Sequence, residues 1–237
     1  MPGYDFPAYR VTNHLVTEMP LRTSALRSLG AFINVFAAES FMDELASAAG
    51  RDPVEFRLAH LSDPRARAVL RAAASRAGWT EWTPSDAAGH GISYARYKNS
   101  AAYCAVVAEV EAVDQVRVCR LVIAVDAGLI INPDGAANQI EGGAVQATSW
   151  TLKERVRFDR FNVTSDTWET YPILRFSDVP SVEVELAAAG ANPSLGVGEC
   201  AQGPTAAAIA NAVCHALGVR VRSLPLTRDR LIAAMAN

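Results

Sequence analysis

The stretch NPSLGVGECAQGPTAAAIANAVCHALG, residues 192–218, places one acidic residue, Glu199, on a glycine-rich bend that leads directly into an apolar, alanine-rich helix. Glycines 196 and 198 permit backbone conformations that other residues avoid, and they let a ligand approach the main chain. The helix begins near Gly203 and Pro204, so its N-terminus offers free N–H groups and a positive dipole end. Glu199 is therefore a candidate general base, and the alternative is a carboxylate that only interacts with the helix terminus.

Composition places the 237-residue chain among folded proteins, with half of its residues hydrophobic and a net charge of −3. This charge argues against a nucleic-acid partner. No apolar run reaches the ~18 residues of a membrane span, and the N-terminus has no signal-peptide pattern. We therefore expect a cytoplasmic chain, which reaches a membrane or the periplasm only through partner subunits.

The four cysteines form no CxxC pair, and the four histidines show no metal-ligand spacing. Cys104, Cys119 and Cys214 are predicted to be small buried residues, whereas Cys200 borders the glycine bend and is left open. All four histidines are predicted to be structural. No GxSxG or other nucleophile motif occurs.

The predicted fold class is α+β, with a helical part at residues 1–78 that carries an arginine loop, and a mixed C-terminal part at residues 79–237. Three helices are predicted between residues 31 and 77, because Asp52 and Asp63 each precede a proline as N-caps. Residues 78–91 are rich in turn formers and are predicted to be a linker or loop. The predicted strands are residues 100–113, 115–128, 155–159 and 181–187. Two further helices are predicted at residues 133–154 and 203–218.

Two other stretches carry candidate site residues. In PLRTSALRSLGAF, residues 20–32, Arg22 and Arg27 could bind an anion at a helix start, or they are surface arginines. In NQIEGGAV, residues 138–145, Gln139 and Glu141 flank a glycine pair. They could meet the edge of a heterocycle, or they form an ordinary polar helix face. Two mid-helix glycines cost ~1 kcal/mol each, so we expect something to pack against their bare backbone.

Taken together, residues 20–46, 125–143 and 196–227 resemble the C-terminal part of the large, molybdopterin-binding subunit of the molybdenum hydroxylases, the xanthine dehydrogenase and aldehyde oxidase superfamily. Within it, RTSALR, DPRARAVL and GISYARYKNSAAYCAVVAEV resemble the branch that contains the beta subunits of isoquinoline 1-oxidoreductase and the corresponding subunits of nicotinate dehydrogenase. The resemblance covers nearly the whole chain, and it implies the molybdopterin-binding α+β fold of that subunit.

This resemblance implies an oxidoreductase that hydroxylates an N-heteroaromatic carbon, nicotinate- or isoquinoline-like, or an aldehyde carbon, with oxygen from water. A molybdenum–molybdopterin cofactor, in its cytosine dinucleotide form, carries a hydroxyl from which a glutamate removes the proton while hydride passes to the metal centre. The family's glutamate matches Glu199, which becomes the expected catalytic base. Arg27 matches an arginine near the metal, Gln139 a glutamine that faces the pterin, and Leu29 the position of a substrate-contacting aromatic. The residues expected to lie against the cofactor through their backbone are Gly196, Val197 and Gly198.

Two departures from the family pattern affect these expectations. Cys200 stands where relatives have proline, which places an oxidation-prone thiol beside the site. The upstream glycine-rich loops that grip the cofactor are missing. Either the large subunit is split, and the cofactor is shared with a separate chain that carries its N-terminal half, or the sequence is a truncated product. Electrons would leave through a small subunit with a 2Fe-2S cluster, with haem or FAD on other subunits. The alternative function is a non-catalytic interaction module that completes a partner's surface.

Because the upstream loops are missing, we expect the purified chain to retain no cofactor and to be inactive. Elemental analysis of the purified chain checks this expectation. One tightly bound molybdenum per chain would contradict it.

Overall fold

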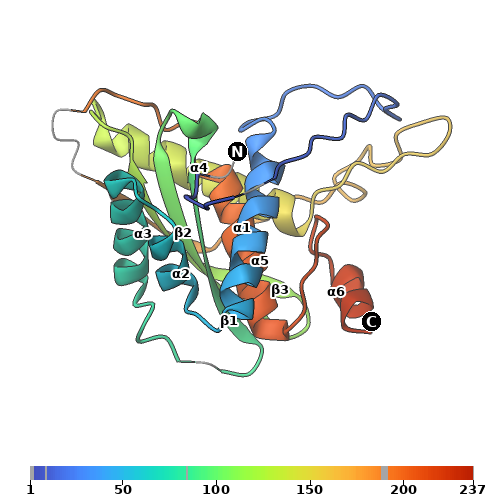
Figure 1. The fold of residues 1–237 in the computed structure, drawn as a ribbon. Coiled ribbons are helices and arrows are strands. Elements are labelled where there is room, and N and C mark those ends of the chain that lie inside the picture. Colours follow the sequence, from blue (N-terminus) through green and yellow to red (C-terminus); the bar gives the residue numbers. More distant parts are fainter. Residues whose placement is uncertain (1–2, 9, 84, 188–191, 237) are drawn as a thin grey trace.

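The computed structural model describes residues 3–8, 10–83, 85–187 and 192–236 (Figure 1). The helices are α1 (Ala31–Ala48), α2 (Pro53–Ala59), α3 (Pro64–Ala77), α4 (Pro133–Leu152), α5 (Gln202–Leu217) and α6 (Arg228–Met235). The strands are β1 (Ala88–Arg96), β2 (Tyr103–Ala112), β3 (Val116–Asp126) and β4 (Ser181–Leu186). They form one sheet in the order β1–β2–β3–β4, antiparallel except for the parallel pair β3 and β4. The predicted α+β class is confirmed.

The sheet carries helices on both of its faces, with α2 and α3 on one side and α5 on the other (Figure 1). Because side chains alternate along a strand, β2 contributes to two cores. Cys104 and Val106 belong to the core that contains α5, whereas Tyr103 and Ala105 belong to the core that contains α3. Helices α1–α3 therefore share a core with the strands, and a boundary at residue 78 stays a prediction.

Helix α5 is the most enclosed element, since every residue from Gln202 to Val213 is buried. It contacts β1, β2, α1 and α4. Glycines permit this close approach. A Cβ at Gly91 would overlap the backbone nitrogen of Ala212 and lie 2.5 Å from the carbonyl oxygen of Ala208. A Cβ at Gly203 would lie 2.8 Å from Cβ of Val35 on α1.

A buried carboxylate on α1 joins four segments of the chain. Glu39 accepts hydrogen bonds from the Tyr4 hydroxyl at 2.7 Å, from Arg57 Nε at 2.9 Å and from the Tyr94 backbone N–H at 2.9 Å. Its carbonyl oxygen also accepts from Asn211 Nδ2 of α5 at 3.3 Å. Glu39 and Arg57 are both almost fully buried, and each satisfies a charge that would be costly alone.

Local signals locate the helix boundaries correctly. Asp52 accepts hydrogen bonds from the backbone of Val54 and Glu55, and Asp63 caps α3 in the same way. Gly78 ends α3 with φ of 67°. The predicted helices at residues 133–154 and 203–218 and the predicted hairpin of β2 and β3 are confirmed.

Three predictions made from local patterns need correction. The loop predicted at residues 78–91 is wrong at its end, because residues 88–91 belong to β1, where glycines admit α5. The strand predicted at residues 155–159 is wrong, since its only pairing in the described chain is an isolated bridge between Phe158 and Val163. Helix α6 was not predicted. Cys104 is buried as expected, but Cys119 and Cys214 are only half-buried.

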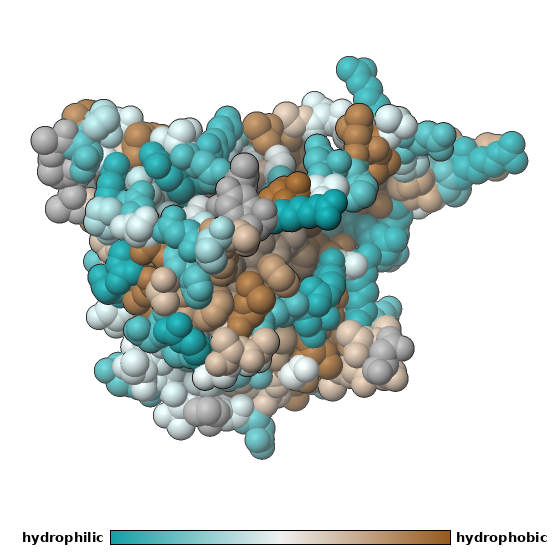
Figure 2. All heavy atoms as spheres, viewed as in Figure 1, coloured by the Kyte–Doolittle hydropathy of each residue, from teal (hydrophilic) through white to brown (hydrophobic). Residues whose placement is uncertain are grey.

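Exposed apolar side chains gather on two segments that extend from the body of the molecule (Figure 1). These segments, residues 10–26 and 155–179, contain almost no regular secondary structure. Leu15 is 80% exposed on the first, and Phe161 and Trp168 are 81% and 77% exposed on the second. Figure 2 shows such apolar side chains among hydrophilic ones at the surface. None of the described helices has the length and hydropathy that crossing a bilayer requires.

The substitution Gly91→Ala is expected to destabilise the chain by roughly 3 kcal/mol, because the new methyl group overlaps the backbone of α5. Gly142→Ala is the matched control. A Cβ there meets no atom within 4 Å, so the gain in helix propensity should stabilise the chain by roughly 0.5–1 kcal/mol. Urea unfolding of both variants measures the difference. Equal effects of the two substitutions would contradict the close packing of α5.

Candidate active site

The structure brings together three of the predicted site residues from distant parts of the chain. Arg27 lies in the loop before α1 and donates from Nε to the carbonyl oxygen of Gly198 at 2.6 Å. Its Nη2 donates to Gln139 of α4, at 2.9 Å to the backbone oxygen and 3.3 Å to Oε1. One guanidinium therefore links the loop before α1, the exposed side of α4 and the glycine bend that carries Glu199.

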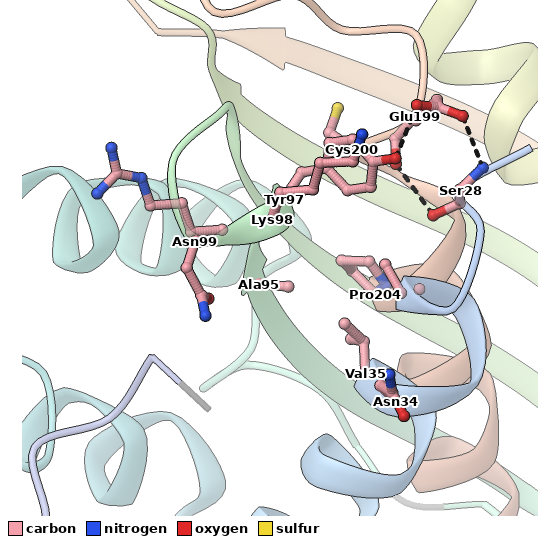
Figure 3. A pocket seen from close by; sticks show the side chains of 13 residues that line it. Ser28, Asn34, Val35, Ala95, Tyr97, Lys98, Asn99, Glu199, Cys200 and Pro204 are labelled. Atoms are coloured by element: carbon pink, nitrogen blue, oxygen red, sulfur yellow. Dashed lines mark hydrogen bonds between the residues drawn. The ribbon is translucent and has the colours of Figure 1, made fainter. Parts of the chain in front are cut away.

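Two segments hold the Glu199 carboxylate between them (Figure 3). Oε1 accepts a hydrogen bond from the Ser28 backbone N–H at 3.0 Å, and Oε2 accepts one from the Tyr97 hydroxyl at 2.7 Å. The Ser28 hydroxyl also donates to the Glu199 carbonyl oxygen at 3.1 Å. Glu199 borders a pocket of about 150 Å³ whose walls include Val35 and Pro204. No local pattern in the sequence indicated Tyr97 or Ser28 as site residues.

Both segments turn sharply to reach this carboxylate. Ser28 and Leu29 have φ of 73° and 50°, and Lys98 and Asn99 have φ of 52° and 56°. Residues other than glycine seldom adopt this left-handed conformation, which costs about 1–3 kcal/mol per residue. Two such pairs at one pocket indicate that the surrounding structure fixes both turns. The first turn points the Ser28 N–H at Glu199, and the second follows Tyr97.

A buried glutamine completes the cluster. Gln202, at the start of α5, is fully buried. With its amide oriented to satisfy both neighbours, it donates to the Glu199 carbonyl oxygen at 3.0 Å, and its oxygen lies 2.6 Å from Arg27 Nε and shares that N–H with the Gly198 carbonyl oxygen. A Cβ at Gly143 would lie 2.7 Å from the side-chain amide atom of Gln202 that faces Arg27, which explains one of the two mid-helix glycines. Gln202 is one of the few polar residues of an otherwise apolar helix, and this was a signal that could have identified it from sequence.

Hydrogen bonds dominate the electrostatics of Glu199. The Tyr97 hydroxyl and then the Ser28 N–H hold the pKa of this carboxyl below its ordinary value of 4.5, and the charges of Lys98 and Arg27 act in the same direction. Slight burial opposes them. Burial, together with the bond to Glu199, raises the pKa of Tyr97 to about 12. At neutral pH the pair is therefore an ionised carboxylate beside a protonated phenol.

The other predicted site residues lie near this cluster or expose their backbone. Leu29 follows Ser28 and is 47% exposed. A Cβ at Gly196 or Gly198 would meet no atom within 4 Å, so the backbone of the bend is open to an approaching group. Val197 packs partly against the core that contains α5. Arg22 is exposed and has no ion pair within the described part of the chain.

Cys200 and the other side chains that could ligate a metal determine which ligand could bind at this site. Cys200 is buried next to Glu199, and its Sγ lies 3.5 Å from the Val197 carbonyl oxygen. Among the described residues, no group of three or more His, Cys, Asp or Glu side chains could hold a metal ion. The groups that the site does offer are a guanidinium, an amide and an open glycine backbone, which suit a polar organic ligand.

Comparison with known proteins gives one family match and several relatives. Residues 30–180 match the molybdopterin cofactor-binding domain family. The chain is 45% identical, over its whole length, to a subunit of the nicotinate dehydrogenase of Pseudomonas putida. It is 35% identical over 95% of its length to the beta subunit of isoquinoline 1-oxidoreductase of Brevundimonas diminuta. The chain spans only 21% and 29% of these two relatives.

A solved structure supports the fold. The aldehyde oxidoreductase of Desulfovibrio gigas superimposes on 90% of the chain with a TM-score of 0.73, and the chain covers 42% of that protein. The two sequences are 17% identical, so the likeness concerns the fold alone.

The lowered pKa of Glu199 predicts a pH-dependent contribution to stability. A carboxyl whose folded pKa lies below its unfolded value stabilises the fold above the unfolded value, and this contribution is lost as the pH falls through the folded pKa. We expect the free energy of unfolding to fall more between about pH 6 and about pH 3 in the wild type than in Glu199→Gln. Urea titrations at several pH values measure it. The control is Glu111→Gln at a carboxylate that is 58% exposed, and identical slopes in wild type and Glu199→Gln would contradict the interpretation.

Proposed function

Because the chain belongs to the molybdopterin cofactor-binding domain family, we propose that it forms part of the large subunit of a molybdenum hydroxylase and supplies the catalytic base, Glu199. Such an enzyme oxidises an N-heteroaromatic carbon or an aldehyde carbon with oxygen from water. Nicotinate- and isoquinoline-like rings are proposed first, because relatives at 45% and 35% identity are named for these compounds.

The convergence of Arg27, Gln139 and Glu199 is the observation that carries this proposal. Arg27 is separated from Gln139 by 112 positions and from the bend at Gly198 by 171, yet its guanidinium contacts both. A carboxylate that merely stabilised a helix terminus would not need this surrounding. In the described part of the chain, Glu199 forms no ion pair with lysine or arginine, and it borders a pocket instead.

The residues around the bend fit the molybdopterin cofactor. Gly196 and Gly198 leave space where side chains would stand, and Arg27 and Gln139 lie beside them. We propose that Arg27, Gln139 and the backbone of Gly196, Val197 and Gly198 hold the cofactor in its cytosine dinucleotide form. When bound, the cofactor supplies two-electron redox chemistry and a Lewis acid that activates oxygen from water.

The chain's own contribution is the transfer of one proton. Ionised at neutral pH, Glu199 can accept the proton of a water-derived oxygen at either carboxylate oxygen, because each oxygen that already accepts one hydrogen bond keeps a second lone pair. Leu29, half-exposed next to Ser28, is proposed to contact the substrate. A leucine in place of an aromatic ring gives a pocket that differs from that of the xanthine-oxidising enzymes.

We propose that other polypeptide chains supply the rest of the site. The pocket of about 150 Å³ is smaller than the roughly 300–1,000 Å³ of typical small-molecule sites. Segments 10–26 and 155–179 expose large apolar side chains of the kind found at protein interfaces. We propose that they contact the remainder of the large subunit, and that a small subunit with a 2Fe-2S cluster removes the electrons. The competing proposal is an interaction module in which Glu199 has only a structural role, and its two satisfied oxygens favour that alternative.

Glu199→Gln in the assembled complex separates the two proposals. The amide keeps the shape of the side chain but cannot accept the proton, so turnover should fall by about 10²–10⁴-fold while molybdenum content is unchanged. Turnover of nicotinate with a redox dye, together with elemental analysis, measures both quantities. Glu111→Gln is the control at an exposed ion pair on β2 and should leave turnover intact. Turnover retained in Glu199→Gln would exclude the base assignment.

A further inference from the structure

The orientation of the Glu199 carboxylate depends on other segments rather than on its own loop. Glycines 196 and 198 have no neighbours within 4 Å of the place where a side chain would stand, so the bend does not itself pack around the carboxylate. The hydrogen bonds from Ser28 N–H and the Tyr97 hydroxyl instead occupy one lone pair on each carboxylate oxygen. With both oxygens bound, rotation of the carboxylate about its own axis is restricted.

A hydrogen-bonded turn positions the Tyr97 hydroxyl. Tyr97 begins the 3₁₀ turn Tyr97–Asn99 at the end of β1, and its backbone N–H donates to the carbonyl oxygen of Ala102 at 2.9 Å. Its ring packs against the core that contains α5, and Lys98 Nζ lies 5.2 Å from the ring centroid. The left-handed backbone of Lys98, with φ of 52°, is a costly conformation of the kind that is found mainly at functional sites.

We propose that Tyr97 is a positioning residue of the active site: together with the Ser28 N–H, its hydroxyl holds the Glu199 carboxylate in the single orientation from which it accepts a proton. This inference rests on the proposed function, since it assigns Tyr97 a task in that reaction. The two hydrogen bonds from the Ser28 N–H and the Tyr97 hydroxyl to the Glu199 carboxylate, called the clamp below, exist in the chain without cofactor or partner.

Loss of the hydroxyl has two separable consequences. The groups that face Glu199 are Tyr97 and Lys98 from the turn after β1 and Arg27 and Ser28 from the loop before α1, and all four lower its pKa. Tyr97 has the largest effect, so its removal raises the pKa. The carboxylate becomes a stronger base but is no longer held in place. Turnover should therefore fall while the acidic limb of its pH profile moves upward, which a purely structural role would not cause.

The first experiment titrates Glu199 in the 237-residue chain. Carboxyl signals of chain labelled with ¹³C-glutamate are followed by NMR against pH, and the Glu199 signal is assigned by its loss in Glu199→Gln. We expect Tyr97→Phe, which keeps the ring and so the packing, to raise the pKa of Glu199. The matched control is Tyr171→Phe, because Tyr171 donates to Glu154 at 2.8 Å at a tyrosine–glutamate pair outside the site. A Glu199 titration unchanged by Tyr97→Phe overturns the proposal.

The second experiment measures the assembled complex with nicotinate as the probe. Tyr97→Phe should lower kcat roughly tenfold with KM unchanged, the size expected for one hydrogen bond to a charged group. The acidic limb of kcat against pH should move upward, whereas Glu111→Gln, at the exposed ion pair on β2, should change neither. If the titration of the chain shifts but the acidic limb does not, the clamp stands and the role of Glu199 as base is overturned. If the titration does not shift, the clamp itself is wrong whatever the kinetics show.

Discussion

The close packing of α5 fixes the position of the bend that carries the proposed base. Twelve consecutive residues, from Gln202 to Val213, are buried, and most of them are alanine or other small residues. The sheet and α1 approach this helix so closely that glycine is required opposite it, at Gly89 and Gly91 on β1. Because α5 cannot shift without a clash of backbone against backbone, the bend that precedes it has a fixed place, and Glu199 stands on that bend.

Helix α1 fixes the position of the loop on the other side of the site. Its middle is anchored by Glu39, whose buried carboxylate binds Tyr4, Arg57 and the backbone of β1. Its N-terminal loop carries Arg27 and Ser28, which contact Gln139 and Glu199. One buried ion pair therefore anchors the helix that follows the loop around the proposed base. Replacing both members of such a pair with apolar residues often costs little stability, whereas removing one member leaves an unpaired buried charge and is strongly destabilising.

The chemistry of the site follows from where charge is balanced. Glu199 is stabilised as an anion by a phenol and a backbone amide, and two nearby cations add to this effect without pairing with it directly. Such an anion is available to accept a proton at neutral pH, and its surroundings restrict its motion. The open backbone of Gly196 and Gly198 leaves one side of the bend free for a large bound group. The family to which the chain belongs is one that binds such a group.

Features that depend on neighbouring residues could be read from the amino-acid order alone. Asp52 and Asp63 before proline defined two helix starts, and the alanine-rich run predicted α5. An acidic residue on a glycine bend likewise indicated Glu199. Features that depend on distant contacts emerged only in the folded chain. Gly89 and Gly91 look like turn residues until α5 lies against them. Tyr97 has no local signal because its partner is 102 positions away. The physical reason is that capping and helix propensity act over a few residues, whereas burial and hydrogen bonds between segments require the complete fold.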